Sequence, residues 1–229
     1  MATIPVNLQA VLARIENAAR VYGRMPGTVG LLAVSKTWPA SRVLEAAAAG
    51  QRAFGENYVQ EGIDKIREVA RTDLEWHFIG PLQGNKTRQV AEAFDWVHSV
   101  DRLKIAERLS AQRPRTLPPL QACLQVNISG EATKSGVAPQ DVSALAREVA
   151  RLPGIALRGL MAIPAPAADL AGQREPFARL RRLFEQLIRE GLALDTLSMG
   201  MSGDIEAAVA EGATLVRVGT AIFGERDKS

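Results

Sequence analysis

The sequence predicts an α/β fold, a single (β/α)8 barrel of the TIM type with one extra helix at its N-terminus. Eight short apolar runs alternate with segments long enough to hold a helix, and 229 residues is a common length for a one-domain barrel. We expect strands at 31–35, 53–55, 75–78, 96–99, 120–127, 155–163, 196–198 and 215–218. An open doubly wound sheet is the main competitor. It usually carries a glycine-rich fingerprint after its first strand, where this sequence has Lys-Thr-Trp-Pro.

Apolar residues at helical spacing predict the outer layer. In the segment 6–22, Leu8, Val11 and Ile15 lie along one stripe, and the segments 57–70 and 174–190 show the same periodicity. About ten residues follow the last strand, too few for a full outer helix. We therefore expect the N-terminal helix to cover that part of the barrel wall. The segment 163–172 reads as a loop, and we expect one domain over residues 1–229.

Composition limits the classes of partner. The formal net charge is +3, from 28 basic and 25 acidic residues, and no dense basic run indicates nucleic acid binding. A single cysteine cannot form an internal disulfide, which is compatible with a reducing compartment. Neither a secretory signal pattern nor an apolar run of membrane-spanning length is present. We expect a monomeric cytoplasmic protein that binds neither nucleic acid nor membrane.

Lys36 is the sharpest single candidate for chemistry. It directly follows the first predicted strand, at the end where barrels of this kind carry their sites. Alternation puts Leu32, Val34 and Lys36 on one face of the strand. If that face is the interior, desolvation favours the neutral amine that a Schiff base requires. Position alone favours the alternative, a lysine that ends a strand and reaches solvent.

The loops after the last two strands predict a phosphate site. Ser-Met-Gly-Met-Ser-Gly-Asp at 198–204 leads into a predicted helix, and Gly219 and Thr220 follow the last strand. Glycines let backbone N–H groups approach a ligand closely, and hydroxyls such as that of Ser202 add donors. Phosphate commonly binds at these two loops in such barrels. The alternative is ordinary turn chemistry, with Ser202 capping the following helix.

Arg217 interrupts the last apolar strand. Alternation places it on the same face as Gly219. A buried arginine needs an acceptor, because an unpaired buried charge is prohibitive. A pyridine nitrogen is one such acceptor, and a structural carboxylate such as Glu56 is the alternative.

These elements together resemble the pyridoxal phosphate homeostasis protein family, also called the PLP-binding protein family, and more distantly the barrel domain of alanine racemase. Matching segments follow one another along most of the chain. They are LAVSKT at 32–37, FGEN at 54–57, WHFIG at 76–80 with Leu82, Gln83, Asn85 and Lys86, QVNI at 125–128 with Glu131 and Lys134, GLM at 159–161, LSMGMS at 197–202 and VRVGTAIFG at 216–224.

The resemblance implies pyridoxal 5′-phosphate (PLP) as cofactor, held as an internal aldimine on Lys36. It implies phosphate contacts from Ser202, Gly219 and Thr220, beside Met199 and Met201. It further implies Arg217 at the pyridine nitrogen and Asn57 near the ring. His77 falls in a matching motif, where a structural role is the alternative to a contact with the cofactor. Lys86 and Lys134 follow predicted strands and could assist transfer, unless they are solvated loop lysines.

The same resemblance implies a role in intracellular PLP homeostasis as a carrier, buffer or regulator, without a conventional catalytic activity. Apo forms of PLP-dependent enzymes are the expected partners. Racemisation requires acid–base groups on both faces of the substrate, and a second group beside Lys36 is not evident. Alanine racemases take theirs from an additional C-terminal domain, and this sequence ends ten residues after Gly219. The alternatives are a small PLP-dependent racemase and a barrel enzyme for a phosphorylated metabolite that uses Lys36 without PLP.

Overall fold

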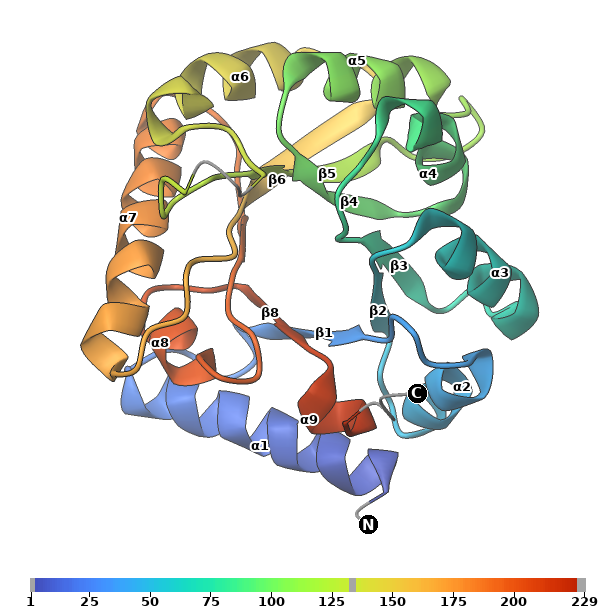
Figure 1. Ribbon diagram of the computed structural model, residues 1–229. Coiled ribbons are helices and arrows are strands. Elements are labelled where there is room, and N and C mark those ends of the chain that lie inside the picture. Colours follow the sequence, from blue (N-terminus) through green and yellow to red (C-terminus); the bar gives the residue numbers. More distant parts are fainter. Residues whose placement is uncertain (1–2, 132–134, 226–229) are drawn as a thin grey trace.

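The computed structural model describes residues 3–131 and 135–225, and its sheet is a closed barrel of parallel strands in sequence order (Figure 1). Lys134 lies outside the described residues. The strands are β1 (Gly30–Val34), β2 (Ala53–Glu56), β3 (Glu75–Phe78), β4 (Trp96–Val100), β5 (Leu120–Gln125), β6 (Ile155–Met161), β7 (Thr196–Ser198) and β8 (Leu215–Val218). The predicted fold class is confirmed, and β1 closes the barrel against β8. Two predicted strands, 120–127 and 155–163, end two residues early, where the chain turns into the loops of the mouth.

Helices surround the barrel in a single outer layer (Figure 1). They are α1 (Ile4–Val21), α2 (Ala40–Ala48), α3 (Val59–Val69), α4 (Thr87–Ala93), α5 (Leu103–Gln112), α6 (Val142–Val149), α7 (Leu170–Arg189), α8 (Ile205–Ala210) and α9 (Thr220–Phe223), with short 3-10 turns η1 (Gly84–Lys86) and η2 (Pro139–Asp141). Among the described residues, none of these helices is both long and apolar enough to cross a membrane.

The N-terminal helix lies where we expected it. α1 packs against α2, α8 and α9, across the wall formed by β8 and β1 (Figure 1). Its buried stripe includes Leu8, Val11 and Ile15. α9 has four residues and covers little of that wall by itself.

The expectation for 163–172 was wrong at its C-terminal end, because α7 begins at Leu170. The side chain of Asp169 accepts a hydrogen bond from the backbone N–H of Gly172 at 2.7 Å. An aspartate at this position satisfies an otherwise unpaired N–H group of the first helical turn. The two prolines of the segment precede the helix, and the loop is shorter than we predicted.

Two packing regions follow from the alternation of side chains along the strands. Residues that point outward, such as Leu31 and Ala33, join the large apolar core between barrel and helices. A separate cluster lies in the barrel interior, with one residue from each of three neighbouring strands: Trp96 of β4, Cys123 of β5 and Met161 of β6. The other buried side chains of the interior include four polar ones, His77, His98, Ser198 and Arg217.

Candidate functional site

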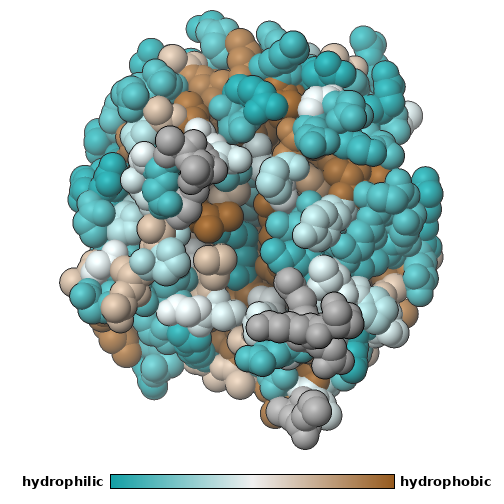
Figure 2. Space-filling model, in the orientation of Figure 1, coloured by the Kyte–Doolittle hydropathy of each residue, from teal (hydrophilic) through white to brown (hydrophobic). Residues whose placement is uncertain are grey.

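A cavity of about 330 Å³ opens at the mouth where the strands end. Figure 2 views this mouth and shows hydrophobic side chains in a hollow near the centre of a mostly hydrophilic face. The cavity is lined by Val34, Lys36, Asn57, Ile79, Ile163, Met201, Ser202, Gly203, Arg217, Gly219 and Thr220. Seven of the nine residues predicted for the site therefore lie around one space, although they come from distant parts of the sequence.

Lys36 is half-buried at the edge of the cavity, two residues after the end of β1. The apolar side chain of Val34 lines the same space, which agrees with the predicted alternation along the strand. The next residue, Thr37, has a left-handed backbone with φ of 68°. This conformation is uncommon for a residue other than glycine and needs support from its surroundings.

A buried ionic cluster provides that support from α3. The Lys65 ammonium donates to the Ser35 carbonyl at 2.7 Å, to Glu56 at 2.9 Å and to Glu61 at 2.6 Å. Glu61 in turn accepts from the backbone N–H of Thr37. The main chain is therefore held on both sides of Lys36, and α3 sets the position of the lysine.

Burial governs the electrostatics of this cluster. Glu56 is fully buried, and desolvation raises the pKa of its carboxyl although Lys65 and Ser35 oppose the shift. The Ser35 hydroxyl donates to Glu56 at 2.5 Å. Because Glu56 is occupied by Lys65 and Ser35, it is not the carboxylate partner that the sequence offered as an alternative for Arg217.

Asn57 reaches the cavity immediately after β2. Its buried side-chain oxygen has no hydrogen-bond partner among the described residues. Gly80 packs against it so closely that a Cβ there would lie 2.1 Å from the Asn57 carbonyl oxygen. Only glycine allows this approach, so Gly80 positions Asn57.

The loop after β7 is held by the N-terminal helix. Arg14 of α1 donates to the Ser202 carbonyl at 2.6 Å and forms a two-pronged ion pair with Glu206 of α8. Within the loop, the Asp204 carboxylate accepts from the backbone N–H of Met201 at 2.6 Å. Ser202 thus sits in a fixed turn beside the cavity, across from Gly219 and Thr220.

Arg217 forms part of the cavity floor and is buried. Its guanidinium donates to the Ser198 carbonyl at 2.6 Å, the Ser198 hydroxyl at 2.8 Å and the Ala162 carbonyl at 3.0 Å. Burial lowers the pKa of Arg217 to about 10, so it stays protonated in neutral solution. Over residues 3–131 and 135–225, no carboxylate forms an ion pair with it.

Two predicted residues do not line the cavity. His77 lies deeper in the barrel, bonded to His98 at 2.9 Å and to Glu75 at 2.7 Å, and its ring stacks on Trp96. Met199 is fully buried in the outer apolar core. The family resemblance implied Met199 beside the cofactor and left His77 between a cofactor contact and a structural role. In the structure both take packing and hydrogen-bonding positions away from the cavity lining.

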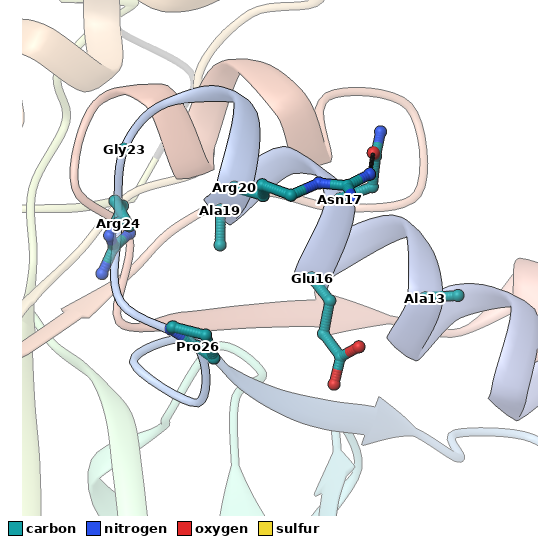
Figure 3. Close-up of a pocket in the computed structure, with 8 residues that line it drawn as sticks. All are labelled: Ala13, Glu16, Asn17, Ala19, Arg20, Gly23, Arg24 and Pro26. Carbon is teal, nitrogen blue, oxygen red and sulfur yellow. Dashed lines mark hydrogen bonds between the residues drawn. The ribbon is translucent and has the colours of Figure 1, made fainter.

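A larger hollow of about 610 Å³ lies along the outer face of α1 (Figure 3). Arg20 and Asn17 bond to each other there, and Glu16 points away from them. Because its polar groups do not converge, this hollow lacks the features of a specific site. No group of three potential metal ligands occurs in the described part of the chain.

Comparison with known proteins places this geometry in context. The family model described as alanine racemase, N-terminal domain, matches residues 6–227. The pyridoxal phosphate homeostasis protein of Pseudomonas aeruginosa is 64% identical over 227 residues, which cover 99% of this chain and 97% of that protein. The protein of the same name from Escherichia coli K12 is 56% identical over 232 residues, covering 100% and 99%.

A solved structure also aligns over most of the chain. PipY of Synechococcus elongatus, determined with PLP bound, is 42% identical with a TM-score of 0.80, and the match covers 92% of this chain and 100% of that chain. Alanine racemase of Corynebacterium glutamicum is 18% identical with a TM-score of 0.67, covering 95% of this chain and 62% of that chain. The latter likeness shows the fold alone.

The substitution Lys65→Met tests the ionic cluster. Removing one partner of a buried ion pair typically lowers the free energy of unfolding by about 3–5 kcal/mol. Without Lys65 the pKa of Glu56 rises further above its unfolded value. A carboxyl of that kind stabilises the fold at low pH, and the contribution is lost as pH rises through the folded pKa.

The decrease in the free energy of unfolding caused by Lys65→Met should therefore be larger at about pH 8 than at about pH 4.5. Urea unfolding at both pH values measures it. Lys104→Met, at an exposed position of α5, is the matched control and should have little effect. An equal decrease at the two pH values for Lys65→Met would contradict the pairing of Lys65 with the buried Glu56 carboxylate.

Proposed function

Because the chain belongs to the pyridoxal phosphate homeostasis protein family, whose barrel is that of the alanine racemase N-terminal domain, we propose that it binds PLP in the mouth cavity and serves intracellular PLP homeostasis. Lys36 would hold the cofactor through a Schiff base. The protein acts as a carrier, buffer or regulator of PLP rather than as a conventional enzyme, and apo PLP-dependent enzymes are the partners that would receive it.

One observation carries the proposal: an amine, a cationic donor and two hydroxyls surround the same cavity. The amine of Lys36 matches the aldehyde of PLP, and the guanidinium of Arg217 matches its ring nitrogen. The hydroxyls of Ser202 and Thr220 match its phosphate. The unpartnered oxygen of Asn57 adds an acceptor at the cavity wall. The residues present therefore fit the group.

Each residue has a distinct task. Ser202, Thr220 and the backbone at Gly219 hold the phosphate, and Arg217 directs an N–H group at the pyridine nitrogen. When bound, PLP supplies an aldehyde that bonds reversibly with amines. An arginine at the pyridine nitrogen disfavours protonation there and so weakens the ring as an electron sink. That arrangement suits storage and release.

The acid–base groups at the cavity favour a carrier over a racemase. Among the described residues that line it, Lys36 and Arg217 are the ionisable ones, and Arg217 stays charged. Tyr58 is 59% exposed at the start of α3, and Tyr22 lies on the far side of the barrel wall beside Arg174. The relatives in P. aeruginosa and E. coli are named for homeostasis.

Lys36→Ala tests the Schiff base. Wild-type protein mixed with PLP should develop a yellow absorbance band that borohydride bleaches, and Lys36→Ala should not. Lys104→Ala, which removes an exposed lysine of α5, is the control and should keep the band. An unchanged band in Lys36→Ala would contradict the proposal. Absence of the band from wild-type protein would favour a site for a phosphorylated metabolite without PLP.

Ser202→Ala combined with Thr220→Val tests the phosphate contacts. Each hydrogen bond to a charged group contributes about 1.5–3 kcal/mol, so the pair should account for an affinity loss of about 100-fold or more. The affinity for pyridoxal, which lacks the phosphate, should change little. Ser41→Ala with Thr116→Val makes the same changes at exposed positions and is the control. An unchanged preference for PLP over pyridoxal would exclude these contacts.

Hydrogen exchange at the α-carbon decides between carrier and enzyme. PLP-loaded protein is incubated with a panel of amino acids in D₂O. The α-protons of the amino acids should exchange far more slowly than the roughly 1–1000 per second of ordinary enzymes. Proton NMR of the amino acids measures the rate. Exchange at ordinary enzyme rates would replace the carrier role by the racemase alternative.

A further inference from the structure

A continuous chain of hydrogen bonds crosses the barrel interior behind the cavity. Arg217 donates to the Ser198 hydroxyl at 2.8 Å, and that hydroxyl lies 2.8 Å from Nδ1 of His98. Nε2 of His98 lies 2.9 Å from Nδ1 of His77, whose Nε2 is 2.7 Å from the Glu75 carboxylate. The five residues come from β8, β7, β4 and β3, so the chain exists only in the closed barrel.

The two ends of this chain lie at opposite mouths of the barrel. Arg217 lines the cavity at the end of the strands, whereas Glu75 begins β3 and its side chain is 51% exposed. Glu75 also lines a cavity of about 300 Å³ with residues that precede or begin strands, among them Trp96 and Gln121. The three residues between the ends are fully or almost fully buried.

One arrangement of protons satisfies every bond when both imidazoles are neutral. Burial lowers the pKa of His98 well below its ordinary value, so this ring stays neutral. The hydrogen bond from His77 lowers the pKa of Glu75, so the carboxylate stays ionised and accepts from His77 Nε2–H. His77 Nδ1 then accepts from His98 Nε2–H, and His98 Nδ1 accepts from the Ser198 hydroxyl.

Uptake of one proton from solvent by the two rings reverses part of the chain. The Nε2 proton of His98 passes to Nδ1 of His77, and the added proton ends on Nδ1 of His98. His77 then donates through both nitrogens, and His98 accepts at Nε2. His98 then donates to Ser198 and competes with Arg217 for the lone pairs of the hydroxyl. The rings hold three N–H protons in place of two, and the hydrogen bond that Arg217 donates to the Ser198 hydroxyl weakens.

We propose that Ser198, His98, His77 and Glu75 form a proton-sensing relay that positions Arg217 and couples the opposite mouth of the barrel to the PLP site. The part of the inference that concerns PLP rests on the function proposed above. The four residues are positioning residues, because they act on the cofactor through Arg217.

The other charged groups near the relay are ion-paired, bonded to the backbone or neutral. Beside Glu75, Arg113 donates to three backbone carbonyls, and Asp95 accepts from the Trp76 backbone N–H. Arg158 of β6 pairs with Asp195 and lies over the Trp96 ring, 5.2 Å from its centroid. Burial raises the pKa of the Cys123 thiol on β5 to about 12, which keeps it neutral. Near the other end, Asp204 is bonded to the Met201 backbone and favours the charged form of Arg217.

Histidine NMR on the full-length protein without ligand tests the relay itself. The sequence contains two histidines, so a spectrum of ¹⁵N-histidine-labelled protein reports these two rings alone. We expect each ring to carry its proton on Nε2 while both rings are neutral, and His98 to carry its proton on Nδ1 once the two rings hold three N–H protons. In Ser198→Ala the change at His98 should disappear or shift in pH. A His98 ring that keeps one tautomer until the protein unfolds would overturn the relay.

Absorbance of the PLP-loaded protein tests the coupling to the site. Glu75→Gln keeps an acceptor for His77 and removes the charge, so the pH midpoint of the visible band should fall by about 0.5 unit. Asp73→Asn removes the same charge from an exposed position two residues away and should leave the midpoint unchanged.

In the Ser198→Ala background the effect of Glu75→Gln should vanish. If it persists there, Glu75 acts through space and the relay is wrong. If the wild-type protein shows no visible band at all, PLP binding fails as a proposal, and the NMR experiment still decides on the relay.

Discussion

Closure of a parallel barrel forces the residue that follows each strand to one mouth, and the site depends on this constraint. β1 and β8 are the ends of the sheet in sequence, yet they pair directly and bring Lys36 and Arg217 around one cavity. The same closure requires α1 to cover the wall that α9 is too short to cover. α1 thereby comes within reach of the loop after β7, which Arg14 holds through the Ser202 carbonyl.

Buried charge is the second constraint, and the barrel meets it in two ways. Behind Lys36, the cation of Lys65 faces two carboxylates directly. Behind the cavity floor, Arg217 faces carbonyl and hydroxyl oxygens, and its hydrogen-bonded link to an anion passes through two imidazoles. Direct pairing gives a fixed support, whereas a link through imidazoles can change with protonation. We therefore assign a structural role to Lys65 and a responsive one to the relay.

Period-two alternation and strand ends predicted the strands and five residues of the cavity lining, which are Lys36, Ser202, Arg217, Gly219 and Thr220, and helical periodicity predicted the N-terminal helix. Asn57 and Met201 were expected only from the family resemblance. The sequence did not indicate Lys65, Arg14 or His98. Glu61 and Lys65 are four apart on a helix and resemble an exposed ion pair, and nothing local shows that Lys65 is buried. The bond between His77 and His98 depends on the register of β3 against β4, which pairs His77 with Trp96. Single-sequence patterns do not specify such a register.

The proposed Schiff base between Lys36 and the aldehyde of PLP is the central claim. Mass spectrometry of the full-length protein, digested after incubation with PLP and reduction with borohydride, locates that bond. We predict one modification per chain, on the peptide that contains Lys36. Stoichiometric modification at a different lysine, with Lys36 unmodified, would contradict it.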